Sequence, residues 1–176
     1  MSALPPALII CCGVSGTGKS TLARHLADEL GPVFVEADDF HSPENKAHMA
    51  AGKPLTDAMR EPWIQALCQH IAAHFAAGRQ VVMANSALRR SHRQRFRQLG
   101  GATLFMQLEG PYELIKQRMD SRPNHYMQAE LLKSQFDAQE PPEDEPDFYH
   151  LDISKSVPEL AVEAEHRART FLRELR

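Results

Sequence analysis

The feature that most constrains this chain is an eight-residue segment between an apolar run and a helical pattern. The segment reads Gly13-Val14-Ser15-Gly16-Thr17-Gly18-Lys19-Ser20 and matches G-x-x-x-x-G-K-[ST] in full. Glycines at these positions let the backbone turn its N–H groups inward, and the following helix adds the positive end of its dipole. The segment therefore predicts a loop that cradles phosphate groups.

The side chains of this loop predict a nucleotide as the ligand. Lys19 is expected to reach the β- and γ-phosphates, and the Ser20 hydroxyl is placed to bind Mg²⁺. ATP and Mg²⁺ are thus the predicted cofactors. The dinucleotide pattern G-x-G-x-x-G fails because Thr21 takes its last glycine position, so a nicotinamide enzyme is disfavoured. The predicted ATP-binding residues are Gly13, Val14, Ser15, Gly16, Thr17, Gly18, Lys19, Ser20 and Thr21.

The rest of the chain predicts an α/β fold, because short apolar runs alternate with longer helical patterns, as in βαβ units of a parallel sheet. Five strands are expected at about 7–12, 33–35, 81–83, 104–106 and 151–153. Helices are expected at 19–30, from Ser42-Pro43, from Pro62 to about 78, and from about Pro158 to the C-terminus. The length suits one domain, so residues 1–176 are predicted to form a three-layer structure, a five-stranded parallel sheet flanked by helices.

Composition and charge exclude several classes of protein. The net charge is −3, and no aromatic row accompanies the basic stretch 89–97, so nucleic acid is not an expected partner. No segment approaches the roughly 20 apolar residues of a membrane span, and no signal peptide pattern is seen. Cys11 and Cys12 lie together in an apolar run, which is typical of a reduced protein, so a cytoplasmic location is expected.

An acidic stretch, residues 36–39, follows the second expected strand. Ligands of open α/β sheets bind beyond the carboxyl ends of strands, so these carboxylates are expected to face the same crevice as the phosphate loop. Phosphoryl transfer to a hydroxyl uses a carboxylate that orients the hydroxyl and receives its proton, and Asp38 is the candidate. Asp38 is also a candidate Mg²⁺ ligand through a water molecule. The alternative is an acidic surface turn that caps a helix.

Arginines form the second constellation, because guanidinium groups neutralise charge on a transferred phosphoryl group and clamp anionic substrates. On one helix Arg89, Arg93 and Arg97 would share a face. For Arg97 and its neighbours Arg90 and Arg95, a solvated helix is the preferred interpretation. The candidates for a functional role are Arg60, Arg89, Arg93, Arg118 and Arg122.

Two segments near the C-terminal third are interpreted from their composition. Arg118 and Arg122 lie directly before Pro123, where a helix must end, which is a sensible geometry for a lid at about 118–138 that closes over ATP. The Pro-rich acidic segment 140–147 is interpreted as a solvated loop.

Taken together, these motifs resemble those of the gluconokinases, which belong with shikimate kinases among the nucleoside-monophosphate-kinase-like P-loop proteins. The resemblance covers about residues 8–155. Beyond the phosphate loop it rests on Ala37-Asp38-Asp39-Phe40-His41, Asn45, Met49, Gly52, Pro54-Leu55, Asp57-x-x-Arg60-x-Pro62-Trp63, Ser86-Ala87-Leu88-Arg89-Arg90, Arg93, Arg122-Pro123-Asn124-His125-Tyr126-Met127, Leu131-Leu132-x-Ser134-Gln135-Phe136 and Glu140-Pro141-Pro142. Asn85 stands where this family usually has a Cys before Ser-Ala-Leu.

The resemblance implies transfer of the ATP γ-phosphoryl group to the 6-hydroxyl of D-gluconate, with Asp38 as general base. The catalytic residues it implies, together with the phosphate loop, are Lys19, Asp38, Arg118 and Arg122. The substrate-binding residues it implies are Asp38, His41, Arg60, Arg89, Arg93 and His125. Members of the family are often homodimers. Two alternatives stay open: a kinase of the same build acting on shikimate, adenylyl sulfate or a nucleotide, and a nucleotide-binding regulator without catalysis.

Overall fold

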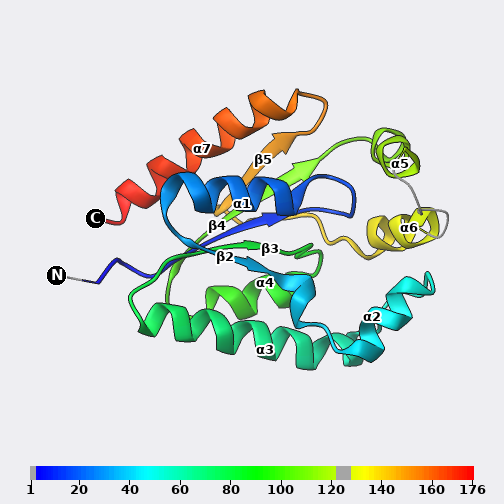
Figure 1. The fold of residues 1–176 in the computed structure, drawn as a ribbon, viewed down its shortest axis with the longest axis horizontal. Coiled ribbons are helices and arrows are strands. Elements are labelled where there is room, and N and C mark those ends of the chain that lie inside the picture. The colour runs from blue at the N-terminus through cyan, green and yellow to red at the C-terminus, as the bar shows by residue number, and fades with distance from the viewer. Residues whose placement is uncertain (1–2, 122–127) are drawn as a thin grey trace.

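A parallel five-stranded sheet forms the centre of the molecule in the computed structural model, which describes residues 3–121 and 128–176 (Figure 1). The strands are β1 (Ala7–Cys12), β2 (Val33–Glu36), β3 (Val81–Ala84), β4 (Ala102–Glu109) and β5 (Phe148–Asp152). Their order across the sheet is β2-β3-β1-β4-β5, and every neighbouring pair is parallel. The predicted fold class is thus confirmed, although β4 and β5 begin earlier than the sequence indicated.

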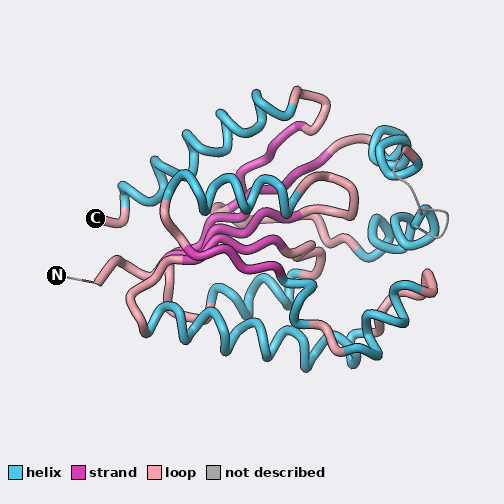
Figure 2. Tube along the Cα trace, in the orientation of Figure 1, coloured by secondary structure: helices cyan, strands magenta, loops and turns pink. Residues whose placement is uncertain are grey.

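Helices cover both faces of this sheet and gather at one edge of it (Figure 2). They are α1 (Lys19–Leu30), the 3₁₀ helix η1 (Ala37–Phe40), α2 (Pro43–Ala50), α3 (Asp57–Ala76), α4 (Arg90–Arg97), α5 (Tyr112–Asp120), α6 (Gln128–Ala138) and α7 (Val157–Glu174). Helices α1 and α7 pack on one face, and α3 and α4 on the other (Figure 1). Each crossover between parallel strands therefore returns through a helix, as βαβ units require.

The core has two layers because β1 is buried on both of its sides. Ala7, Ile9 and Cys11 point into the layer beneath α1 and α7. Leu8, Ile10 and Cys12 alternate with them and point into the layer formed with α3 and α4. This period of two is the side-chain alternation of any strand, and burial on both faces explains why the sequence of β1 is continuously apolar.

Helix α3 begins earlier than the sequence indicated. It starts at Asp57, where the Thr56 side chain accepts a hydrogen bond from Met59 N–H and caps the helix. The predicted start at Pro62 is therefore wrong, because Pro62 lies inside the helix. The extra turn carries Asp57 and the candidate substrate-binding residue Arg60.

The carboxyl edge of the sheet collects the segments that follow the strands. The phosphate loop follows β1, η1 follows β2, and the turn of residues 85–89 follows β3. Gly13 N–H donates to Ser86 O at 3.2 Å, which ties the first of these segments to the third. Helices α2, α5 and α6 lie beyond the same edge (Figure 1). Segments far apart in the sequence thus meet around one space.

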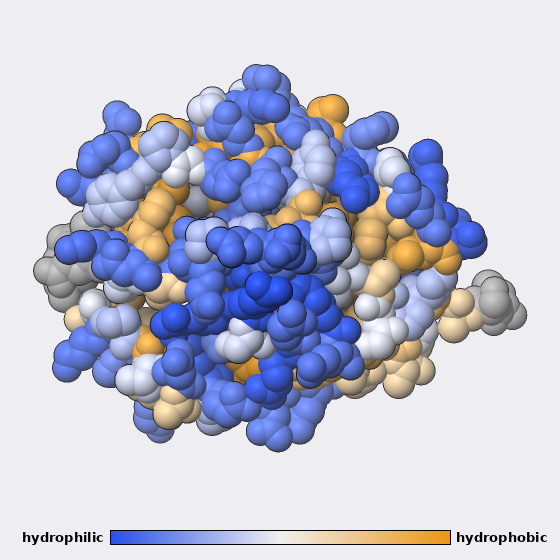
Figure 3. All heavy atoms as spheres, turned by 180° about the vertical axis from the view of Figure 1, so that it is seen from behind, coloured by the Kyte–Doolittle hydropathy of each residue, from blue (hydrophilic) through white to orange (hydrophobic). Residues whose placement is uncertain are grey.

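The opposite view of the molecule shows a mostly hydrophilic surface with separate hydrophobic patches (Figure 3). The large apolar side chains that are exposed among the described residues are Leu4, Val157 and Val162. Within the described ranges, no helix combines the length and the apolar character that crossing a membrane would require.

Candidate active site

The phosphate loop has the backbone conformation that its glycines predict. Gly13, Gly16 and Gly18 all have positive φ, at 133°, 82° and 94°. A Cβ at Gly13 would collide with the Leu108 carbonyl oxygen, and one at Gly16 would lie 2.7 Å from Met119 Cγ. The close approach of β4 and α5 therefore also requires glycine at these two positions.

Lys19 starts α1, and its ammonium group folds back over the loop. Its Nζ donates to Val14 O at 3.0 Å. Burial lowers the pKa of Lys19, and the carboxylates of Asp38 and Glu36 oppose that effect. A partly desolvated ammonium group beside carboxylates is suited to bind an incoming phosphate. Of the other predicted loop residues, Thr17 is buried with its Oγ1 bonded to Val14 O, and Thr21 is exposed on the first turn of α1.

The acidic turn meets the loop where the sequence predicted. The Ser20 hydroxyl donates to the Glu36 carboxylate, and Glu36 also accepts from Asp38 N–H. Asp38 lines the same cavity as Lys19. Hydroxyl and carboxylate oxygens are the ligands that Mg²⁺ prefers, so this group of side chains fits that ion. Within residues 3–121 and 131–176, whose side chains the structure describes, no three His, Cys, Asp or Glu side chains converge as a metal cluster.

Trp63 of α3 supports the turn that carries Asp38. Its indole N–H donates to Ala37 O at 2.7 Å, and its ring stacks on His41 with centroids 4.2 Å apart. His41 is buried, and burial lowers its pKa, so the imidazole is neutral near pH 7. Trp63 is itself buried, and it also lines the cavity.

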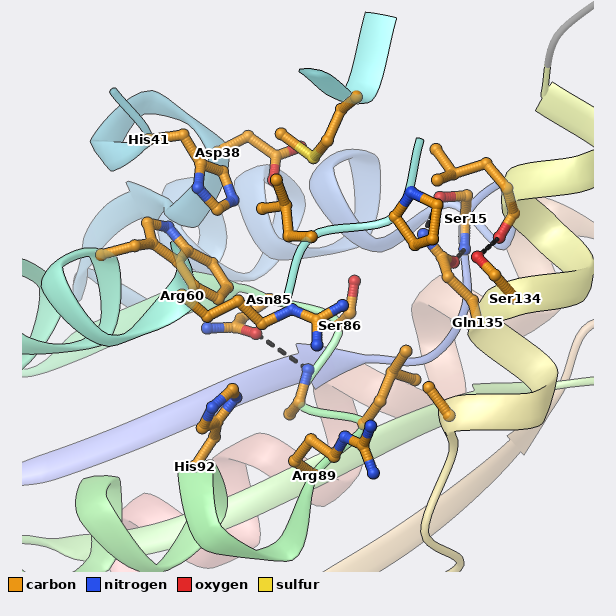
Figure 4. A pocket seen from close by; sticks show the side chains of 18 of the residues that line it. Ser15, Asp38, His41, Arg60, Asn85, Ser86, Arg89, His92, Ser134 and Gln135 are labelled. Carbon is orange, nitrogen blue, oxygen red and sulfur yellow. Dashed lines mark hydrogen bonds between the residues drawn. The ribbon is translucent and has the colours of Figure 1, made fainter. Parts of the chain in front are cut away.

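Two guanidinium groups converge on the cavity from α3 and from the turn after β3 (Figure 4). Arg60 Nη1 lies 3.5 Å from Asp57 Oδ1, and Arg89 Nε lies 4.0 Å from the same oxygen. Burial lowers the pKa of Arg60, Asp57 opposes this, and Arg89 adds to it. Arg89 Nη1 also lies 3.8 Å from Glu140 Oε1. Two exposed carboxylates at these distances neutralise the guanidinium pair only in part, so this end of the cavity favours an anion.

Arg93 does not take the substrate-binding place that the sequence predicted. Its side chain is 2% exposed and donates to both carboxylate oxygens of Glu145 at 2.9 Å. The remaining hydrogen bonds go to the carbonyl groups of Ala87, Leu88 and Glu140. The guanidinium donors are therefore used inside the protein, and Arg93 has a structural role.

The predicted common face of Arg89, Arg93 and Arg97 is also wrong. Arg89 is the N-cap residue of α4 with extended backbone, so its side chain leaves in another direction. Arg97 is not a solvated arginine, because it donates to both Glu145 and Asp147. The acidic segment 140–147 is accordingly not only a solvated loop, since two of its carboxylates bind these arginines.

The lid arginines are only partly placed. Arg118, on α5, donates to Ile153 O at 2.6 Å and is not among the residues that line the cavity. Arg122 and His125 lie outside the described residues. The predicted lid segment contains α6, which begins at Gln128 and reaches the phosphate loop through Gln135.

The cavity itself measures about 960 Å³, at the upper end of the usual range for a small-molecule site. It brings together Lys19, Asp38, His41, Arg60 and Arg89 of the predicted set. Sequence reasoning about single residues missed six polar residues that also line it. Five of them are labelled in Figure 4, namely Asn85, Ser86, His92, Ser134 and Gln135, and the sixth is Asp137.

Comparisons with known proteins place the chain in a family. A family model described as an AAA domain matches residues 8–142. A probable gluconokinase of Rattus norvegicus is 38% identical, and the match covers 89% of this chain and 95% of that protein. A gluconokinase of Gluconobacter oxydans is 41% identical, with 81% of each chain covered. The crystal structure of a gluconokinase from Sinorhizobium meliloti 1021 is similar with a TM-score of 0.85 and 33% identity, covering 99% of this chain and 97% of that one.

Proposed function

Because the chain belongs to the gluconokinase family, we propose that it transfers the γ-phosphoryl group of ATP to the 6-hydroxyl group of D-gluconate. One observation carries this assignment: a single cavity joins Lys19 of the phosphate loop to the guanidinium groups of Arg60 and Arg89. A sugar acid can present a hydroxyl group at the phosphate loop and a carboxylate at the two guanidinium groups. Guanidinium groups bind carboxylates through paired, charge-assisted hydrogen bonds.

In the proposed complex the phosphate loop holds the triphosphate. Lys19 Nζ, now bonded to Val14 O, turns to the β- and γ-phosphates, and the inward N–H groups bind their oxygens. The Ser20 hydroxyl would bind Mg²⁺, with Glu36 and Asp38 holding its water ligands. When bound, the ion neutralises charge on the phosphate oxygens.

Asp38 is the proposed general base. Asp38 lines the cavity, and its carboxylate is close enough to Lys19 to oppose the lowering of the pKa of that lysine by burial. The carboxylate accepts the proton of the 6-hydroxyl while the new O–P bond forms and the bond to the ADP oxygen breaks. The Trp63 hydrogen bond to Ala37 O holds the turn in which Asp38 lies.

Side chains from several elements around the cavity hold the phosphoryl acceptor in the proposed complex. Arg60 and Arg89 bind the carboxylate, and neutral His41 presents a ring nitrogen toward the hydroxyl groups. We assign His125 to the same task, and Arg118 with Arg122 to the charge that develops on the phosphoryl group.

The assembly and location follow from the same assignment. We infer a homodimer in the cytoplasm, where ATP is available, with small molecules rather than nucleic acid as ligands. The net charge of −3 and the ion pairs that occupy Arg93, Arg95 and Arg97 support the last point.

A coupled ADP-release assay with a panel of acceptors tests the activity. We expect turnover that depends on gluconate, with ³¹P NMR showing a phosphate ester at the 6-position of the product. Turnover with shikimate, adenylyl sulfate or a nucleoside monophosphate, and none with gluconate, would refute the proposed substrate. ATP binding without turnover on any acceptor would indicate a nucleotide-binding regulator.

A further inference from the structure

Two buried donors without a hydrogen bond belong to residues of one turn beside the cavity. Among the side chains that the structure describes, those of residues 3–121 and 131–176, Asn85 Nδ2 and Arg89 Nε are the only buried polar atoms that lack a hydrogen bond. Both residues line the cavity, and both belong to the turn between β3 and α4. A buried donor left unpaired costs about 1–3 kcal/mol. Two such donors in one turn that lines the cavity indicate that a ligand supplies the acceptors.

Arg89 is already assigned to the acceptor carboxylate, but Asn85 is not. We propose that Asn85 is an acceptor-binding residue whose Nδ2 group donates to an oxygen of the polyhydroxy acid. This inference rests on the proposed function, because it takes the phosphoryl acceptor to be the ligand of this end of the cavity.

The orientation of the Asn85 amide is fixed by its other contacts. Its Oδ1 accepts from Ala87 N–H at 2.8 Å, drawn as a dashed line in Figure 4. Its own backbone N–H donates to Cys11 O at 3.1 Å, which anchors the residue to β1. The side chain is almost fully buried, with the whole residue 3% exposed. The amide nitrogen is therefore held at a set position before any ligand arrives, and a preorganised donor loses little entropy on binding.

Other residues that line the cavity favour a ligand that brings acceptors. Arg60 and Arg89 offer only donors. His92, on α4, lines the same cavity, and burial lowers its pKa, with the positive charge of Arg60 adding to the effect. This end of the cavity therefore suits a carboxylate together with hydroxyl oxygens.

A purely structural role would use only half of the Asn85 side chain. Ala87 has a left-handed backbone conformation, with φ of 48°, and the Oδ1 hydrogen bond stabilises it. This accounts for Oδ1 and leaves Nδ2 unexplained. Asn85→Asp separates the two roles, because it keeps an oxygen for Ala87 N–H and removes the donor. Asn85→Ala removes both.

The test measures kcat, the KM for gluconate, the Kd for ATP and the Tm of wild-type, Asn85→Asp and Asn85→Ala proteins. Loss of one hydrogen bond to the acceptor should raise the KM for gluconate about tenfold or more in both variants. The Kd for ATP should stay within about twofold. Asn85→Asp should keep a Tm close to wild type, whereas Asn85→Ala should lower it.

A panel of monodeoxygluconates removes the effect of the charge that Asp introduces. In the wild type, the analogue that lacks the contacted hydroxyl should show a raised KM relative to gluconate. In Asn85→Ala that difference should vanish, because the donor is gone. Glucitol, which lacks the carboxylate, tests the remaining possibility. If the KM values for glucitol and gluconate differ in the wild type but not in Asn85→Ala, while no deoxy analogue shows such a change, the contact is to the carboxylate. In that case the proposal also holds.

Two results would overturn the proposal. If both variants had the wild-type KM for gluconate and the wild-type differences between gluconate and its analogues, Nδ2 would donate to no oxygen of the substrate. A raised KM for gluconate in Asn85→Ala, together with a wild-type KM in Asn85→Asp, would show that Asn85 serves only to bind Ala87 N–H. A wild-type protein without gluconate turnover would instead refute the proposed function, and the role of Asn85 with it.

Discussion

Gln135 of α6 holds Ser15 of the phosphate loop through two hydrogen bonds. Its Oε1 accepts from Ser15 N–H at 2.6 Å, and its Nε2 donates to Ser15 Oγ at 2.9 Å. These residues are 120 positions apart in the chain. The contact places the predicted lid helix directly against the loop expected to bind ATP, so the order of α6 and the conformation of the loop are linked.

Replacing Gln135 with Ala should therefore loosen α6. Both hydrogen bonds are lost, and each contributes roughly 0.5–1.5 kcal/mol. We expect faster amide hydrogen exchange in α6 without ATP, together with a lower kcat/KM for gluconate. Lys133→Ala, an exposed residue of the same helix, is the control. Unchanged exchange in the Gln135 variant would show that the contact does not hold the helix.

Lys19→Ala should abolish turnover while the fold remains. The ammonium group is expected to stabilise charge on the transferred phosphoryl group, so kcat should fall by at least about 100-fold. The coupled assay measures kcat, and circular dichroism measures the Tm. Lys46→Ala, an exposed lysine of α2, should behave as wild type. Activity near wild type in Lys19→Ala would be incompatible with phosphates bound at this loop.

Asp38→Asn should lower kcat much more than it weakens ATP binding. The amide cannot accept the hydroxyl proton, and loss of a general base costs about 100- to 10,000-fold. Asp39→Asn is a matched control, because Asp39 is the next residue of η1 and does not line the cavity. Isothermal titration gives the Kd for ATP. If kcat were the same in both variants, Asp38 would not be the base.

The ion pairs of Glu145 make stability depend on acidic pH. Burial raises the pKa of Glu145, but the hydrogen bonds from Arg93 and Arg97 outweigh it and lower the pKa to about 2. A carboxyl group whose pKa is lower in the folded state than in the unfolded state stabilises the folded protein. Its contribution is complete at a pH above the pKa of the unfolded state, near 4.5, and is lost as the pH falls toward 2. Denaturant titrations from pH 7 to pH 2 should therefore show a declining free energy of unfolding.

Glu145→Gln should reduce the free energy of unfolding at pH 7 by about 3–5 kcal/mol, because it leaves the buried Arg93 charge without its carboxylate. It should also flatten the dependence on pH between 4.5 and 2. Glu143→Gln, an exposed residue of the same segment, should change neither quantity. A Glu145 variant as stable as wild type would mean that the ion pair contributes nothing net.

Local patterns were sufficient to predict much of this molecule. The glycines of the phosphate loop, the apolar β1 and the capped start of α2 at Ser42 depend on near neighbours, and the sheet follows from alternating strands and helices. The shared cavity of Lys19 and Asp38 followed from a general property of parallel sheets.

The errors concern contacts between distant segments. Arg93 and Glu145 are 52 positions apart, and composition alone could not show that an acidic loop folds onto a basic helix. Arg89 and Arg93 have helical spacing, yet α4 begins between them, so a one-residue difference in the helix boundary separated their roles. For Gln135 the family resemblance marked the segment but gave no role to the residue.

The anchoring of Glu140 determines how α6 can move. Its N–H donates to Leu88 O at 2.8 Å, and its own carbonyl accepts from Arg93 at 3.1 Å. The two peptide groups that flank the Glu140 Cα, just beyond the C-terminal end of α6, are thus tied to the rigid part of the molecule. Any swing of the helix must pivot about this point, so its Gln128 end travels through a longer arc than Gln135 does. A small rotation at the pivot would be enough to break the contact with Ser15.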